Sequence, residues 1–166
     1  MRRVGAVFVC LGTLAGCADL PGDEVGHWQI TATMGETTCG PSVGQSERQF
    51  EVQIRRDGET GWWIGPAQVP IQGRIDDDGN FTFRTNEQVL VREGTAGIAP
   101  CVMDQVDIAE GRAEGSLDAM ENMWVGASSG ADCSDQVGLM PGQFAVLPCQ
   151  MTFALVGEAP VNDASQ

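Results

Sequence analysis

The chain has 166 residues, with 9 basic and 23 acidic groups and a formal net charge of −14. Every basic residue is arginine, and the excess of acid repels nucleic acid phosphates, so we expect no nucleic acid partner. The 22 glycines and eight prolines leave little room for helices. About 150 residues follow the first sixteen, enough for one domain with a single core.

A charged head, an apolar segment and four small or apolar residues open the chain. Arg2 and Arg3 precede Val4 to Leu14, and the segment closes on Leu14-Ala15-Gly16-Cys17. This order predicts a secretory signal, because a helix that spans a membrane needs roughly 20 apolar residues. An ordinary secretion signal and a twin-arginine signal are the alternative interpretations.

The four residues Leu14-Ala15-Gly16-Cys17 resemble the lipobox of bacterial lipoproteins. The resemblance implies that residues 1–16 are removed as a signal peptide, that Cys17 carries a diacylglycerol and that its amino group receives an acyl chain such as palmitate. It also implies a membrane partner, through the lipid, at the bacterial cell envelope. Because Ala18 follows the cysteine, the family's sorting pattern favours the outer membrane in a Gram-negative source.

Four cysteines remain once Cys10 leaves with the signal and Cys17 carries lipid: Cys39, Cys101, Cys133 and Cys149. An even number in an oxidising compartment predicts two disulfides, with three possible pairings. We favour Cys133–Cys149 with Cys39–Cys101, because the first pair closes a short loop before the last strand. No metal site is predicted, since the cysteine spacing lacks the close pair that zinc sites use.

Apolar and polar residues alternate with period two along most of the remaining chain, which is typical of strands. The expected domain covers residues 26–157, between a lipidated tether at 17–25 and a flexible tail at 158–166. Only residues 118–123 have mild helical composition. The expected strands are 27–34, 49–55, 61–64, 69–75, 81–84, 89–92, 102–108, 115–117, 122–126 and 147–155.

Asp-Gly turns at Asp57-Gly58 and at Asp78-Gly79 separate successive expected strands, as in β-hairpins. Short strands at this spacing predict an all-β fold: an antiparallel meander of about eight strands, closed into a barrel or folded as a sandwich. Gly26-His27-Trp28 opens the first strand, and this G-x-W resembles the start of calycin barrels, the lipocalin and avidin-like proteins. The resemblance implies a tryptophan across the barrel floor and a small apolar ligand in the interior.

Three motifs resemble catalytic or metal-binding sites, but each lacks part of the pattern that such a site needs. Gly40-Pro41-Ser42-Val43-Gly44 matches the serine hydrolase elbow G-x-S-x-G, but no expected strand and helix flank it. The sole histidine, His27, lies upstream and lacks a visible set of partners. Asp76 and Asp78 form a weak calcium candidate, because the acidic loop fails the EF-hand pattern at both ends. We therefore predict no enzyme, no cofactor and no catalytic residue.

Trp62 and Trp63 are adjacent, so on a strand their rings face opposite sides. One is expected in the core, and the other is either a ligand or partner surface or is packed under a loop. The leading hypothesis is a non-enzymatic envelope lipoprotein whose β domain acts in binding or structural support. The alternatives are a calycin-like carrier of a small apolar ligand, and an inhibitor of a protease or lysozyme that uses the loops at 94–100 or 130–141.

Overall fold

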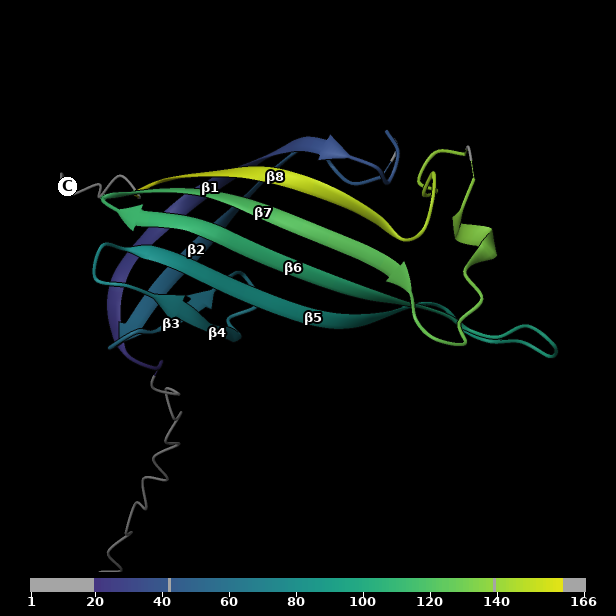
Figure 1. The fold of residues 1–166 in the computed structure, drawn as a ribbon, viewed down its shortest axis with the longest axis horizontal. Helices are drawn as coiled ribbons and strands as arrows, with labels where there is room; N and C mark the ends of the chain where they lie inside the picture. Colours follow the sequence, from purple (N-terminus) through teal and green to yellow (C-terminus); the bar gives the residue numbers. More distant parts are fainter. Residues whose placement is uncertain (1–19, 42, 139, 160–166) are drawn as a thin grey trace, which may run out of the picture.

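The computed structural model describes residues 20–41, 43–138 and 140–159 as an eight-stranded antiparallel barrel (Figure 1). Each strand pairs with the next along the chain, and the last pairs with the first. Among these residues, no helix is long and apolar enough to cross a membrane. The strands are β1 (Asp23–Thr37), β2 (Glu47–Asp57), β3 (Thr60–Ile64), β4 (Pro70–Ile75), β5 (Asn80–Arg92), β6 (Cys101–Glu114), β7 (Ser116–Ala127) and β8 (Cys149–Glu158).

The predicted all-β meander is confirmed, and it is a barrel. The mild helical composition at 118–123 proved misleading, because these residues lie within β7. The two short segments expected at 81–84 and 89–92 belong to the single strand β5. β1 begins at Asp23, so part of the expected tether is already strand.

Strands β3 and β4 are much shorter than their neighbours. Within the described residues, β3 pairs with β2 only over Gln53–Asp57, and β4 pairs with β5 only over Phe81–Phe83. The wall between β2 and β5 is therefore short, and the first half of β2 and the second half of β5 extend beyond it (Figure 1).

The other end of the barrel is packed shut by large apolar side chains. Trp28 on β1 is buried, and its indole Nε1 donates to the carbonyl of Gly115 at 3.3 Å. Trp63, Phe81 and Phe83 form a cluster with ring centroids 5.3–5.9 Å apart. Gly73 faces Phe83 so closely that a Cβ would lie 2.4 Å from its ring, so any larger residue here would displace the aromatic cluster. We call this the closed end.

Two disulfides confirm that the four cysteines are paired, but the favoured pairing was wrong. The bonds join Cys39 to Cys149 and Cys101 to Cys133. The prediction paired cysteines that are close in sequence, whereas the pairing follows from which strands are neighbours in the closed barrel. β1 and β8 are neighbours, so Cys39 after β1 lies beside Cys149 at the start of β8. In the same way, β6 and β7 bring Cys101 near Cys133.

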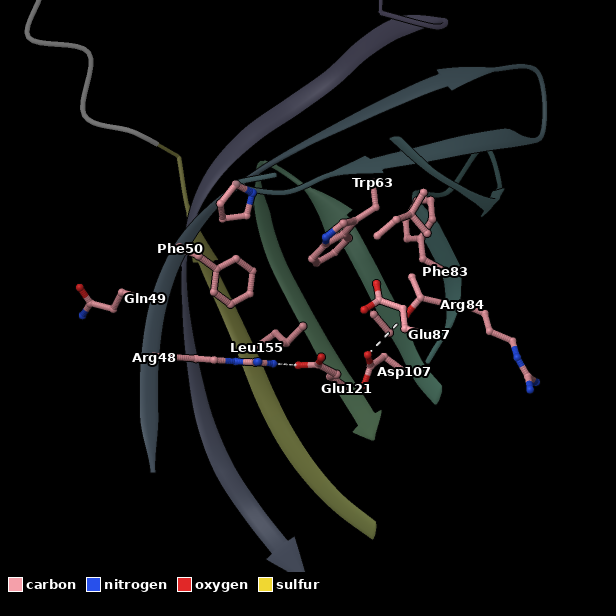
Figure 2. Close-up of a pocket in the computed structure, with 14 residues that line it drawn as sticks. Arg48, Gln49, Phe50, Trp63, Phe83, Arg84, Glu87, Asp107, Glu121 and Leu155 are labelled. Carbon is pink, nitrogen blue, oxygen red and sulfur yellow. Dashed lines mark hydrogen bonds and ion pairs between the residues drawn. The ribbon is translucent and has the colours of Figure 1, made fainter. Parts of the chain in front are cut away.

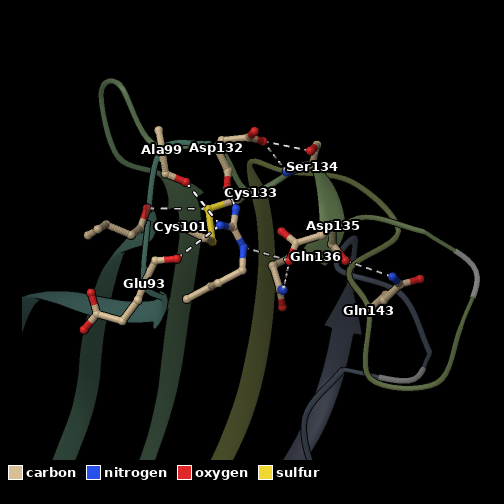
Figure 3. Close-up of polar contacts among 11 residues, drawn as sticks. Glu93, Ala99, Cys101, Asp132, Cys133, Ser134, Asp135, Gln136 and Gln143 are labelled. Carbon is tan, nitrogen blue, oxygen red and sulfur yellow. Dashed lines mark hydrogen bonds and ion pairs between the residues drawn. A yellow bond between two sulfur atoms is a disulfide. The ribbon is translucent and has the colours of Figure 1, made fainter. Parts of the chain in front are cut away.

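Both disulfides lie at the end of the barrel opposite the closed end, where loops join the strands. Arg92 fixes two of these loops: its guanidinium donates to the carbonyls of Ala99 at 3.2 Å and Asp132 at 2.6 Å, and to Asp135 at 3.0 Å (Figure 3). The loop at 94–100 and the segment 130–138 are thus held side by side next to the Cys101–Cys133 bond.

Candidate functional site

A cavity of about 410 Å³ lies inside the barrel where its wall is short. Inward-facing residues of β2, β3, β5, β6, β7 and β8 line it, together with Pro66 of the β3–β4 connection and Ile71 of β4. Its floor is the aromatic cluster of the closed end. The side chains of Gln49 and Arg84, also at its border, point away from it (Figure 2).

Arg48 on β2 points into the barrel interior from the same face as Phe50, Val52 and Ile54. Its guanidinium forms an ion pair with Glu121 on β7. This ion pair crosses the interior in front of β1 and β8 (Figure 2). The guanidinium carbon also lies 4.5 Å from the ring centroid of Phe153. Stacking of this kind stabilises an arginine that is partly removed from water.

Asp107 on β6 is the second polar centre of the cavity. Its Oδ2 accepts hydrogen bonds from Gln105 Nε2 at 2.8 Å and from Thr85 Oγ1 at 3.4 Å. Its Oδ1 is buried and has no hydrogen-bond partner among the described residues. Burial raises the pKa of Asp107, partly offset by these hydrogen bonds, and the nearby Glu87 on β5 raises the pKa further.

The pKa of Glu121 is also subject to opposing effects. Burial raises the pKa of Glu121, and the charge and hydrogen bond of Arg48 act in the opposite direction. Asp107 is close enough to add to the rise. The interior thus holds carboxylates that repel one another around one guanidinium.

A second cavity of about 400 Å³ lies nearer the disulfide end and is lined mainly by apolar side chains of β5, β6, β7 and β8. Arg48 borders both cavities. The interior therefore consists of two apolar compartments separated by a polar layer. The apolar residues of the second compartment are Val43, Val89, Val91, Met103, Met123, Val125, Phe144, Met151 and Phe153.

The two adjacent tryptophans lie on opposite faces of β3, as strand geometry predicts. Trp63 is only 8% exposed and borders the first cavity. Trp62 lies on the outer face under the N-terminal segment, where a Cβ on Gly22 would approach its ring to 2.7 Å. Arg55 holds this segment in place by donating to the carbonyls of Pro21 at 3.0 Å and Gly22 at 2.5 Å. Trp63 is thus the tryptophan that reaches the cavity, and Trp62 is packed under a loop.

The other candidate residues lie apart from the cavity. The Asp76 carboxylate accepts from the backbone N–H groups of Asp78 at 3.0 Å and Asn80 at 2.9 Å, so its oxygens stabilise the β4–β5 turn. These hydrogen bonds, above all the one from the Asn80 side chain, lower the pKa of Asp76. His27 is exposed on the outer face of β1, 3.5 Å from Glu51. Ser42 and Cys17 fall outside the described residues.

Within residues 20–41, 43–138 and 140–159, the side chains of His, Cys, Asp and Glu form no group of three placed to hold a metal ion. The acidic turn at Asp76 and Asp78 is included in that range.

The charged residues of the cavity were missed by the sequence analysis. The sequence pattern could have indicated that Arg48 faces the interior, because it alternates in phase with Phe50, Val52 and Ile54 on the apolar face of its strand. On β6 the pattern misleads, because Asp107 faces the interior while the apolar Val106 and Ile108 face outward. Alternation alone would have placed Asp107 in solvent.

Comparison of the chain with known protein families, characterised proteins and solved structures finds no match.

Proposed function

We propose that this protein binds a small, largely apolar molecule inside its barrel and does so as a lipid-anchored protein of the bacterial envelope. The observation that carries the binding proposal is the unfilled interior. The first cavity alone has about 410 Å³, within the range of roughly 300–1,000 Å³ typical of small-molecule sites. Its walls combine apolar and aromatic side chains with a few polar groups, the usual composition of such sites.

The short wall beside the cavity supports the same proposal. A ligand can enter between β2 and β5 without unfolding a strand, because β3 and β4 do not extend across this part of the barrel. Neither the closed end nor the disulfides need to open. The anchoring half of the proposal is supported by the lipobox-like residues Leu14 to Cys17.

Binding can be tested with the neutral fluorophore N-phenyl-1-naphthylamine, whose emission rises in apolar surroundings, and with 1-decanol as a competitor. We expect saturable binding that decanol reverses, accompanied by a change in tryptophan emission because Trp63 borders the cavity. Ala109→Phe places a ring in the cavity and should weaken binding at least tenfold, since the ligand loses its space.

The matched control is Ala154→Phe, because Ala154 lies exposed on the outer face of β8. This variant should bind like the wild type. The proposal is wrong if the fluorophore fails to bind, or if both phenylalanine variants, folded by circular dichroism, bind as well as the wild type.

A further inference from the structure

The charged groups at the cavity are unequal in number. Among the described residues that line it, the carboxylates are Glu87, Asp107 and Glu121, and the arginines are Arg48 and Arg84. Arg84 points away from the cavity (Figure 2). One interior guanidinium therefore faces three carboxylates.

The single interior cation is already engaged. Arg48 pairs with Glu121 and stacks over the ring of Phe153 at 4.5 Å. Its Nε is buried and has no hydrogen-bond partner among the described residues. Its charge is already balanced by the carboxylate of Glu121. Within the described residues, neither Asp107 nor Glu87 takes part in an ion pair. Arg48 lowers the pKa of Asp107 through its charge, but by less than burial raises it.

Asp107 also has one carboxylate oxygen without a hydrogen bond among the described residues. Both of its donors, Gln105 and Thr85, reach Oδ2, and Oδ1 is left buried without a partner. A buried acceptor without a donor costs free energy, and in native proteins such atoms nearly always find one. Oδ1 is covered by protein atoms, so a donor on a ligand reaches it only after the Asp107 side chain rotates, and a positively charged donor would then form the stronger bond.

The surroundings of Asp107 suit a cation with an apolar body. Trp63 and Phe83 border the same cavity, and the negative faces of aromatic rings attract ammonium groups. Ile71, Ala109 and Leu155 provide apolar surface beside them. Low polarity around the site also strengthens the attraction between opposite charges.

We infer that the ligand of this cavity is a cationic amphiphile, with an ammonium group that contacts Asp107 and Glu87 and an apolar chain that fills the barrel. The inference rests on the proposed binding function and adds the charge of the ligand to it. It assigns the recognition of the ligand head to β5 and β6, and that of its chain to the apolar side chains that line the same cavity.

Three probes of equal chain length separate the possibilities: decylamine, 1-decanol and decanoate, each competing with N-phenyl-1-naphthylamine at pH 7.5. We expect decylamine to bind at least tenfold more tightly than decanol, and decanoate to bind most weakly. Asp107→Asn and Glu87→Gln should each reduce the affinity for decylamine relative to that for decanol several-fold, because they remove charge and keep shape. Glu87 is exposed at the cavity border, so its variant should fold normally.

Glu110→Gln is the matched control, since Glu110 lies exposed on the outer face of the same strand as Asp107. It should leave the affinities for all three probes unchanged. If decanoate binds best, or if the three probes bind equally, the ligand is not cationic, and the proposed apolar binding function still stands. If neither the fluorophore nor any probe binds, both proposals are wrong.

Discussion

At the scale of single residues, the polar layer at the cavity is the unusual feature. A guanidinium inside a barrel needs a counter-charge and hydrogen bonds, and Arg48 obtains both from Glu121, with Phe153 beneath its plane. The carboxylates are less well stabilised in their charged forms than the guanidinium. Asp107 and Glu121 are held near each other in a site that water reaches only in part, and burial is the main reason that both pKa values rise. Such groups are more common at binding sites than in purely structural cores.

The raised pKa values predict how stability depends on pH. A carboxyl group whose pKa is higher in the folded than in the unfolded chain favours folding while protonated, and this contribution is lost as pH rises through the folded pKa. The free energy of unfolding should therefore fall as pH increases from about 4, the ordinary range of these groups, through the raised values. Asp107→Asn should flatten this part of the curve, because an amide does not ionise.

Urea unfolding from pH 4 to pH 8 measures the effect. The charged groups that face Asp107 from other strands are Arg48, Glu87 and Glu121, and all remain in the variant. Glu110→Gln corrects for the general repulsion within an acidic protein, because it removes one exposed charge from the same strand. Equal slopes for the two variants would contradict the assignment of Asp107.

At the scale of elements, the fold was largely predictable from the sequence and the cavity was not. Alternation located β1, β2, β4 and β8, because each has one apolar and one largely polar face. The Asp57-Gly58 turn located β3, whose outward residue Trp62 is also apolar. β6 and β7 carry apolar residues on both faces, so their limits and inward faces could not be read from periodicity. The cavity depends on the lengths of β3 and β4 relative to β2 and β5, a property of the pairing between strands.

The disulfide pairing also depends on which strands are neighbours and could not be read from the sequence. The two bonds differ in loop length, which allows a prediction. Cys39–Cys149 joins residues 110 apart and clips β1 to β8, whereas Cys101–Cys133 joins residues 32 apart. In the chain-entropy model the longer loop restricts the unfolded chain more, by about 1 kcal/mol. Replacing Cys39 and Cys149 by alanine should therefore lower the free energy of unfolding by about 1 kcal/mol more than replacing Cys101 and Cys133.

Both double variants keep an apolar residue at buried positions, so the comparison isolates the bond from the packing. Urea unfolding under oxidising conditions gives the two free energies. A larger loss on removing Cys101–Cys133 would show that the packing of the loops around Arg92, and not loop length, determines how much each bond contributes.

At the scale of the whole molecule, the two ends of the barrel are built differently. The described chain enters at Leu20, and Arg55 near the β2–β3 turn holds the segment at Pro21 and Gly22 beside the closed end. The disulfides and the loops lie at the opposite end. An anchor at Cys17 would therefore place the closed end nearest the membrane and leave the disulfides and the loops facing away from it.

This arrangement predicts that anchoring and ligand binding are independent. Cys17→Ser removes the thiol that would take the lipid, so the protein should move from the detergent phase to the aqueous phase and retain its leader, as it should when signal peptidase II is inhibited. Its affinity for N-phenyl-1-naphthylamine should match that of the anchored protein within about twofold, because the segment at Pro21 and Gly22 packs on the outer face of the barrel and not in the cavity. Unchanged detergent partitioning would contradict the anchor, whereas a large loss of affinity with normal partitioning into water would mean that the membrane forms part of the binding site.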